Sequence, residues 1–300
     1  MGSDFSQLGG WLGVDAVQQA FAAQYRRLRD ASPNLYGADW PSRGKEPILL
    51  YKSWRDVLGD YPAYVAQQIG DCVGQGHGRG ADLLQAVEIA LGEPSEYREV
   101  STEFVYATGR EVGNILGRQD GSYGSITVRA MTTIGLVSRE MVGTNGAYSG
   151  NRAKEWGLRG APQSLKTAAA DFKLGSAALV KTWGELVAAI GNGYPVTICS
   201  NQGFSLQRDA QGFCQARGTW AHCMLIGGVR FDRPGACILQ SWGSNNPTGP
   251  RDLDQPSFSF WADRPVVERI LAQGDSWALS KAPEFVSRPL PAHWSYDSAA

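Results

Sequence analysis

Apolar side chains recur at helical spacing between residues 73 and 91 of the chain. Steps of three and four residues place such side chains on one face of a helix. The set consists of Ala81, Leu83, Leu84, Val87, Ala90 and Leu91. Gly92 follows directly and is a helix-stop signal. The pattern therefore predicts a long helix that begins at Cys72.

A shorter helical face lies near the N-terminus, whereas β-like patterns dominate the later half of the chain. The N-terminal face consists of Val14, Val17, Phe21, Tyr25 and Leu28. Segments 218–229 and 236–240 are rich in strand-forming residues, and segment 257–261 alternates polar and aromatic side chains. Helices followed by strands predict a protein of the α+β class.

The same patterns divide the chain into five parts. We expect a helical N-terminal arm or pro-segment-like extension over 1–52 and a helical lobe over 53–142 that carries Cys72. Residues 143–180 are rich in Gly and Ala and are expected to form a long connection. A β-rich lobe over 181–281 carries His222 and Gln240, and a tail rich in Pro and aromatic residues follows over 282–300.

Composition narrows the classes of partner and cofactor. The formal net charge is -1 and there is no basic block, which argues against binding to nucleic acid or to an anionic membrane. No apolar run approaches the roughly eighteen residues that span a bilayer, and no secretory signal is recognisable, so we expect a cytoplasmic or virion location. The five cysteines contain no Cys-x-x-Cys pair, so neither a metal site, a cofactor nor a disulfide framework is expected.

Cys72 is the candidate nucleophile because of its position at a helix start. The aligned peptide dipoles and unpaired N–H groups there stabilise a thiolate and lower the pKa of the thiol. The alternative is that Cys72 is a small buried apolar residue, as most free cysteines are. The residues that accompany it decide between these interpretations.

The chain offers three histidines as a base for Cys72. His77 follows Cys72 by five residues, about 140° around a helix, and is expected to face away from the thiol. His293 lies in the tail beside Pro291 and Trp294 and is expected in a loop. His222 lies in a β-rich segment entered from a Gly-containing loop, where a strand presents a base across a cleft. His222 is therefore the candidate base.

The strand predicted over 236–240 leads into Ser241-Trp242-Gly243. With Cys72 and His222, this order resembles the papain family of cysteine peptidases, in which an Asn-Ser-Trp-Gly segment orients the histidine and shields it from water. The resemblance assigns the orienting amide to Gln240. A Gln carbonyl accepts the same bond, but the side chain is one methylene longer and must fold back. Asn245 and Asn246 are the alternatives.

The family completes its oxyanion hole with a Gln side chain that normally precedes the cysteine by six residues. That position is Ala66 here, and Gln67 and Gln68 lie five and four residues before Cys72. A loop shortened by one residue leaves Gln67 in place, with Gln68 as the alternative. Val73 stands where plant and lysosomal members have Trp, so the chain is most similar to divergent bacterial and phage members.

The resemblance covers roughly residues 53–279 and extends to helix signals. Ser101 is expected to cap a short helix, and a helix from about residue 125 is expected to end at Gly135. Thr182 and Glu185 form a Thr-x-x-Glu capping-box pattern. A papain-like two-lobed fold is implied, with the site in the cleft between a helical half and an antiparallel β-rich half.

Two functions follow from this resemblance. The first is a cysteine hydrolase that cleaves peptide or other amide bonds in a peptide or protein substrate. The second is a structural or virion-associated phage protein that uses the same fold with little or no catalysis and forms homo- or hetero-assemblies through its terminal arms. Gln240 and the shifted Gln67 keep the second alternative open, and an open groove at Cys72 distinguishes the first.

A glycine-rich run over 74–80 has a competing interpretation as a phosphate-binding loop. A third glycine of the dinucleotide pattern would fall at Arg79, and no Lys-Ser/Thr pair follows. Gly76 and Gly80 share one helical face, so we expect them to permit close packing of another backbone.

Overall fold

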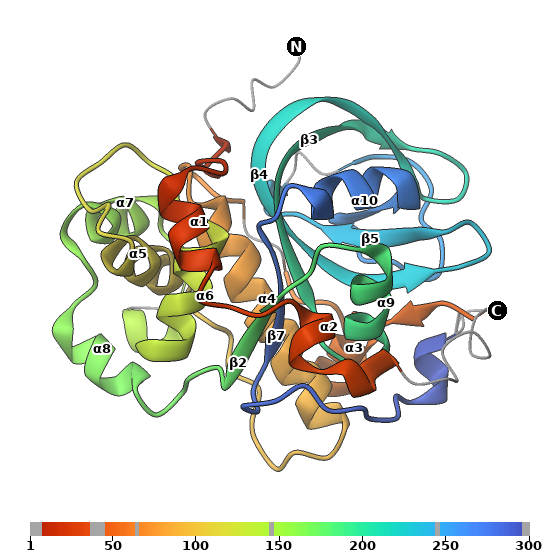
Figure 1. Ribbon diagram of the computed structural model, residues 1–300, viewed down its shortest axis with the longest axis horizontal. Helices are drawn as coiled ribbons and strands as arrows, with labels where there is room; N and C mark the ends of the chain where they lie inside the picture. The colour runs from red at the N-terminus through yellow and green to blue at the C-terminus, as the bar shows by residue number, and fades with distance from the viewer. Residues whose placement is uncertain (1–7, 37–45, 64–65, 144–146, 244–246, 296–300) are drawn as a thin grey trace.

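The computed structural model describes residues 8–36, 46–63, 66–143, 147–243 and 247–295. Its central element is α4 (Cys72–Ala90), which lies between a group of helices and an antiparallel sheet (Figure 1). On one side α4 contacts α5 and α6, and on the other it contacts β3, β4 and β7. The N-terminal residue of α4 is thereby brought to the boundary between the two halves.

The helices form most of the first half of the chain. Some of them, α2, α9 and α10 included, lie instead against the half that contains the sheet (Figure 1). Their bounds are α1 Ala16–Ala22, α2 Leu28–Ala31, α3 Lys52–Leu58, α5 Thr102–Val112, α6 Gly124–Thr133, α7 Gly150–Arg159, α8 Gln163–Ala169, α9 Trp183–Gly191 and α10 Arg264–Ala272, with 3-10 turns at Pro33–Tyr36, Arg139–Val142 and Ala292–Ser295.

The strands form one antiparallel sheet in the order β2-β7-β3-β4-β5-β6, and β1 pairs with β4. Their bounds are β1 Ile48–Leu49, β2 Ser176–Leu179, β3 Val196–Arg208, β4 Cys214–Arg230, β5 Gly235–Leu239, β6 Ser259–Asp263 and β7 Ser276–Ser280. The long β3–β4 hairpin places Cys199 opposite Cys223 and Ser200 opposite His222. The α+β class, with a helical N-terminal half and a β-rich C-terminal half, is confirmed.

The glycines of α4 allow its neighbours to approach closely. A Cβ on Gly76 would lie 2.8 Å from the Cys223 sulfur, and one on Gly80 would lie 2.9 Å from side chains of Thr197 and Leu279. The next helical face, with Gly74 and Gly78, meets α5 in the same way. Close packing explains the glycine-rich run, as expected from the sequence.

Local helix signals are also confirmed. The Ser101 hydroxyl accepts the Phe104 N–H at the start of α5. Thr182 and Glu185 form the reciprocal capping box of α9. Gly135, just after α6, has a positive φ of 111°, which a residue without a Cβ adopts without strain.

Two regions differ from the sequence-based expectation. The single N-terminal helix is interrupted between α1 and α2, because Arg27 leaves helical geometry to bond Glu185 through two contacts of 3.0 Å. Segment 143–180, expected as a long connection, contains α7, α8 and β2. The helical periodicity of this segment is weak in the sequence because small residues, and not large apolar ones, face its neighbours. A Cβ on Gly157, for example, would lie 2.7 Å from the Tyr106 ring.

Both terminal regions pack on the body of the protein. Trp294 in the tail is buried and donates through Nε1 to Asp56 at 2.7 Å.

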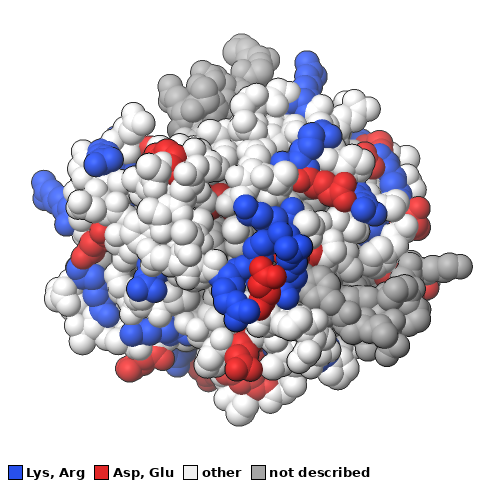
Figure 2. Space-filling model, viewed as in Figure 1, with Lys and Arg blue, Asp and Glu red and all other residues white. Residues whose placement is uncertain are grey.

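Positive and negative side chains are interspersed over the face shown in Figure 2, including the group near its centre. Among the described residues, no helix has both the length and the apolarity needed to cross a bilayer.

Candidate active site

Cys72 is the first residue of α4 and is fully buried. Its sulfur lies 4.0 Å from the carbonyl oxygen of Ala221, the residue that precedes His222 on β4. Burial raises the pKa of Cys72 well above its ordinary value, and the nearby Cys223 adds to that rise. The helix-start position therefore does not produce the low-pKa thiolate expected from the sequence, because desolvation exceeds the dipole effect in this closed arrangement.

His222 is also fully buried, and its ring stacks on Trp242 at 4.4 Å between centroids. Among the described residues, neither ring nitrogen has a hydrogen-bond partner. Burial lowers the pKa of His222 to about 3, so the imidazole is neutral. The stacking on Trp242 matches the expected shield, whereas the expected hydrogen bonds from the ring to Cys72 and Gln240 are not formed.

Gln240 directly follows β5 and is buried. Its backbone N–H donates to the Phe258 carbonyl at 3.3 Å. Trp242, two residues later, contacts both His222 and the ring of Trp220. The structure thus brings the segment after β5 to the His222 side of β4. The alternatives Asn245 and Asn246 lie outside the described residues.

The two adjacent glutamines before Cys72 have different surroundings. The Gln67 side chain accepts the Ser241 hydroxyl at 2.6 Å and donates to the carbonyls of Leu8 at 2.7 Å and Ile69 at 3.0 Å. The Gln68 side chain instead accepts the N–H of Gly150 at the start of α7. Gln67 is therefore the glutamine that lies beside the Ser241-Trp242 segment.

An N-terminal segment occupies the space beside these residues. We call residues 8–12 the N-terminal strap. Its N–H groups at Gly10 and Trp11 both donate to the Ala221 carbonyl, at 2.9 and 3.1 Å. Ser122 donates to the Gly10 carbonyl at 2.7 Å and accepts the Leu12 N–H at 3.0 Å. The strap is thus held by Gln67 and Ala221, next to the thiol, and by the helical half.

Two further features fix the strap. Trp11 packs in one buried cluster with Cys72, Val73, Cys199 and Cys223, and its Nε1 donates to Asp275 at 2.8 Å. A Cβ on Gly10 would lie 2.0 Å from the Gly70 carbonyl oxygen, so only glycine fits there. From the sequence these residues were expected only as part of an arm or pro-segment-like extension over 1–52.

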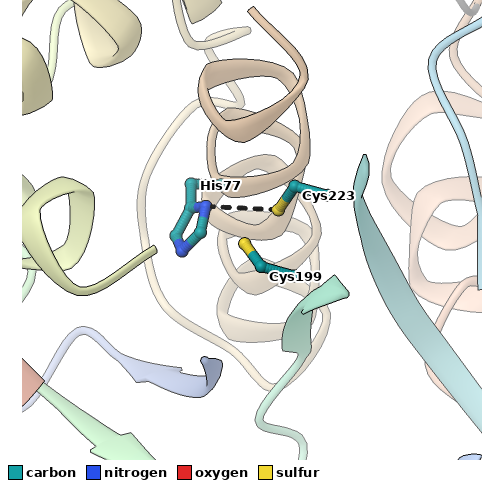
Figure 3. Close-up of side chains that lie close together, drawn as sticks. All are labelled: His77, Cys199 and Cys223. Carbon is teal, nitrogen blue, oxygen red and sulfur yellow. Dashed lines mark hydrogen bonds between the residues drawn. The ribbon is translucent and has the colours of Figure 1, made fainter. Parts of the chain in front are cut away.

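A second group of sulfur and nitrogen side chains lies close to Cys72. His77 from α4, Cys199 from β3 and Cys223 from β4 place one ligand atom each within 4.8 Å of one another (Figure 3). All five cysteines, Cys214 and Cys237 included, are buried free thiols. His77 faces the sheet, and His293 contacts Asp56 at 2.9 Å at the surface. Neither of these two histidines is bonded to Cys72.

Comparison with known proteins finds similarity at the level of structure. No family model and no curated protein sequence matches the chain. Xylellain, a cysteine protease from Xylella fastidiosa, matches with a TM-score of 0.62 and 13% identity over 92% of this chain and 97% of that one.

Two proenzymes match in the same way. Procathepsin B from Trypanosoma congolense has a TM-score of 0.59 and 9% identity over 93% of this chain and 88% of its own. Digestive procathepsin L2 from Tenebrio molitor larval midgut has a TM-score of 0.58 and 11% identity over 93% of this chain and 80% of its own. At these identities the matches establish architecture: the chain has the papain-like fold, in a form whose sequence has diverged far from these structures.

Proposed function

We propose that the chain is a papain-like cysteine hydrolase of peptide or other amide bonds, seen here in a latent form. The observation that carries the proposal is the strap: a stretch of backbone lies against Cys72 and bonds Gln67 and the residue before His222. These are groups that a peptide substrate would use. The fold, shared with cysteine proteases, supports the same assignment.

The proposed roles follow the chemistry of each group. Cys72 attacks the carbonyl carbon, and His222 accepts the thiol proton and later gives it to the leaving amine. Gln67 and the Cys72 N–H, which lies in the first turn of α4, stabilise the oxyanion. Gln240 orients His222, and Trp242 shields it. Water then releases the acyl group and restores the thiol.

Displacement of the strap is the step that prepares this chemistry. Burial is the main cause of the shifted pKa values, raising that of Cys72 and lowering that of His222 to about 3. Admission of water moves both values back toward their ordinary range, which favours transfer of the proton between them. A hollow of about 860 Å³ adjoins the strap at Trp11 and Ala221, so substrate has an approach from that side.

Gly10→Ala tests the proposal in the full-length chain. The added methyl would overlap the Gly70 carbonyl, and an overpacking cost of about 1–3 kcal/mol shifts the equilibrium toward the released strap by roughly 5- to 150-fold. We expect peptidase activity on a mixed peptide library to rise by that factor. The matched control is Gly184→Ala, where an added Cβ has no atom within 4 Å.

A Cys72→Ala change in the Gly10→Ala background should abolish the activity. A hydrolysis rate that Gly10→Ala leaves at zero, in protein whose strap is shown to be released by limited proteolysis, would contradict the proposal. That outcome favours the second candidate, a structural protein with a papain-like body. The observation that favours this candidate is that neither nitrogen of His222 forms a hydrogen bond within the part of the chain that the structure describes.

A further inference from the structure

The cluster of His77, Cys199 and Cys223 lies behind the candidate nucleophile and takes no part in the proposed reaction. The three side chains come from a helix and two strands and converge on one point (Figure 3). All three are at most 1% exposed. We propose that they form a binding site for a thiophilic metal ion of the Zn²⁺ type.

The spacing of the ligand atoms fits such an ion. Bonds of about 2.3 Å to sulfur and about 2.05 Å to nitrogen, at a tetrahedral angle, place the two ligand atoms about 3.6 Å apart. The Cys223 sulfur lies 3.6 Å from Nδ1 of His77. All three ligand atoms, that of Cys199 included, lie within 4.8 Å of one another, so small rotations complete the set.

The sheet holds both thiols on the face that meets α4. Cys199 and Cys223 are opposite one another in the β3–β4 register. The Cys199 N–H donates to the Asp275 carbonyl and not to β4, so this is a non-hydrogen-bonded pair, the kind in which side chains approach most closely. Gly76 of α4 leaves room for the Cys223 sulfur, because a Cβ there would lie 2.8 Å from it.

His77 is already oriented by a group outside the cluster. Its Nε2 lies 3.0 Å from the Thr197 hydroxyl, which in turn lies 3.4 Å from the Trp277 carbonyl. A partner of this type on the far nitrogen of a histidine ligand fixes its tautomer and ring orientation. The near nitrogen, Nδ1, lies 2.9 Å from the Val73 carbonyl, which is also the helical acceptor for the His77 N–H.

Metal binding at this site has a simple proton balance. Cys199 and Cys223 bind as thiolates and release two protons. Neutral His77 gives up its Nδ1–H bond to the Val73 carbonyl, binds through Nδ1 and carries its one ring proton on Nε2, toward Thr197. No oxidant or reductant is required. Because the site is buried, the ion enters as the chain folds, and its binding free energy contributes to folding.

Sequence reasoning missed this group because its members are far apart in the chain and show no ligand spacing. The remaining cysteines provide an internal comparison: the described part of the chain has no second set of three such side chains within reach of one ion. Cys237 is equally buried on β5 and lies outside the set, which makes it the matched control.

The test uses full-length protein with Cys72→Ala, so that the outcome does not depend on the proposed hydrolase. The reduced chain is refolded with Co²⁺ under anaerobic conditions, and the visible and thiolate charge-transfer absorption is measured. We expect one Co²⁺ per chain with thiolate charge-transfer absorption, displaced by one equivalent of Zn²⁺. Cys199→Ala, Cys223→Ala and His77→Gln should each weaken binding by at least about 100-fold, since loss of an outer partner alone costs about 10- to 100-fold.

Two comparisons sharpen the result. Cys237→Ala should leave the affinity unchanged, and Thr197→Val should weaken it by about tenfold as the loss of an outer partner. In the Cys72→Ala protein with no further substitution, bound Zn²⁺ should protect Cys199 and Cys223, and not Cys214 or Cys237, from alkylation during mild unfolding. This second measurement covers the case in which a ligand variant does not fold.

Three results would overturn the proposal. They are the absence of stoichiometric Co²⁺, an equal loss of binding in Cys237→Ala, and a Cys199–Cys223 disulfide in the freshly isolated protein. A disulfide would mean that the two thiols form a redox pair and are not metal ligands. None of these results bears on whether Gly10→Ala releases peptidase activity, so the two proposals fail independently.

Discussion

His222 on β4 and His77 on α4 are both fully buried, yet the pKa values of their imidazoles are shifted in opposite directions. His222 has a stacking partner but no hydrogen bond among the described residues, and burial lowers its pKa to about 3. Burial also lowers the pKa of His77, but the adjacent Cys223 and the Val73 carbonyl outweigh it, so that the pKa of His77 is raised. Burial lowers the pKa of a histidine only where no nearby group compensates for the lost water.

The two histidines differ in whether their ring nitrogens have hydrogen-bond partners. Among the described residues, the ring nitrogens of His222 have no hydrogen-bond partner. His77 has a contact at each nitrogen. The following predictions test this difference, beginning with the largest effect.

Loss of the Trp11 ring should expose Cys72 to solvent. Trp11→Ala removes the buried indole and its bond to Asp275, a loss of about 3 kcal/mol that corresponds to roughly 100-fold more released strap. We expect alkylation of Cys72 by iodoacetamide at neutral pH to accelerate accordingly, while Cys214 and Cys237 react at their original rates. Val14→Ala, at an exposed position, serves as the control. Unchanged labelling of Cys72 would show that the strap does not protect it.

The neutral state of His222 predicts an acid-sensitive fold. Its pKa is about 3 in the folded chain against an ordinary value of 6.5, so the unfolded chain binds the extra proton between these two values. The contribution of His222 to stability is therefore present above pH 6.5 and is lost as the pH falls through that window. Between pH 7 and pH 4 the loss is about 3 kcal/mol.

Urea unfolding at the two pH values measures this loss. His222→Gln should reduce the pH dependence by that amount, whereas Gly184→Ala, which removes no titratable group and has open space around it, should leave it unchanged. Equal pH dependence in the wild type and His222→Gln would mean that water reaches His222.

Overpacking between α4 and the sheet should lower the stability of the fold. Gly76→Ala places a methyl 2.8 Å from the Cys223 sulfur and should lower the free energy of unfolding by about 2 kcal/mol. Gly184→Ala, in a helix with open space around the position, should be neutral or slightly stabilising. Thermal and urea unfolding of both variants check this. A Gly76→Ala protein as stable as Gly184→Ala would show that the helix–sheet contact is looser than described.

The smallest effect concerns the partner of His77. Thr197→Val removes the hydroxyl 3.0 Å from Nε2 and should cost about 1 kcal/mol, because a buried polar atom loses its bond. Thr133→Val, at an exposed position in α6, provides the matched control. If the two variants are equally stable, the Thr197 hydroxyl does not hold His77.

Features encoded by neighbouring residues were predictable from the sequence. The start of α4, the Ser101 cap and the capping box at Thr182 depend on residues within a few positions of one another. The papain-like fold followed from the order of motifs around Cys72 and His222. The close packing at Gly76 and Gly80 was predictable because glycine destabilises a helix, and a neighbouring element that packs closely against the helix compensates for this cost.

Features that depend on distant contacts were not predictable. The break after α1 is caused by Arg27 reaching Glu185, which is 158 residues away in the chain. The pKa of Cys72 is raised because the thiol is buried. Trp11 of the strap belongs to the cluster that buries it, and no local pattern around Cys72 reveals this contact. The cluster of His77, Cys199 and Cys223 requires the pairing of two strands and their contact with a helix before its members meet.

The fit of Gly10 against Gly70 also determines the register of the strap. A shift by one residue in one direction would bring Trp11 against the Gly70 carbonyl, where not even a methyl group has room. A shift in the other direction would place Gly9 there without a clash but would draw the indole of Trp11 away from Asp275. The strap therefore has one stable register, and it leaves this position by detaching and not by sliding.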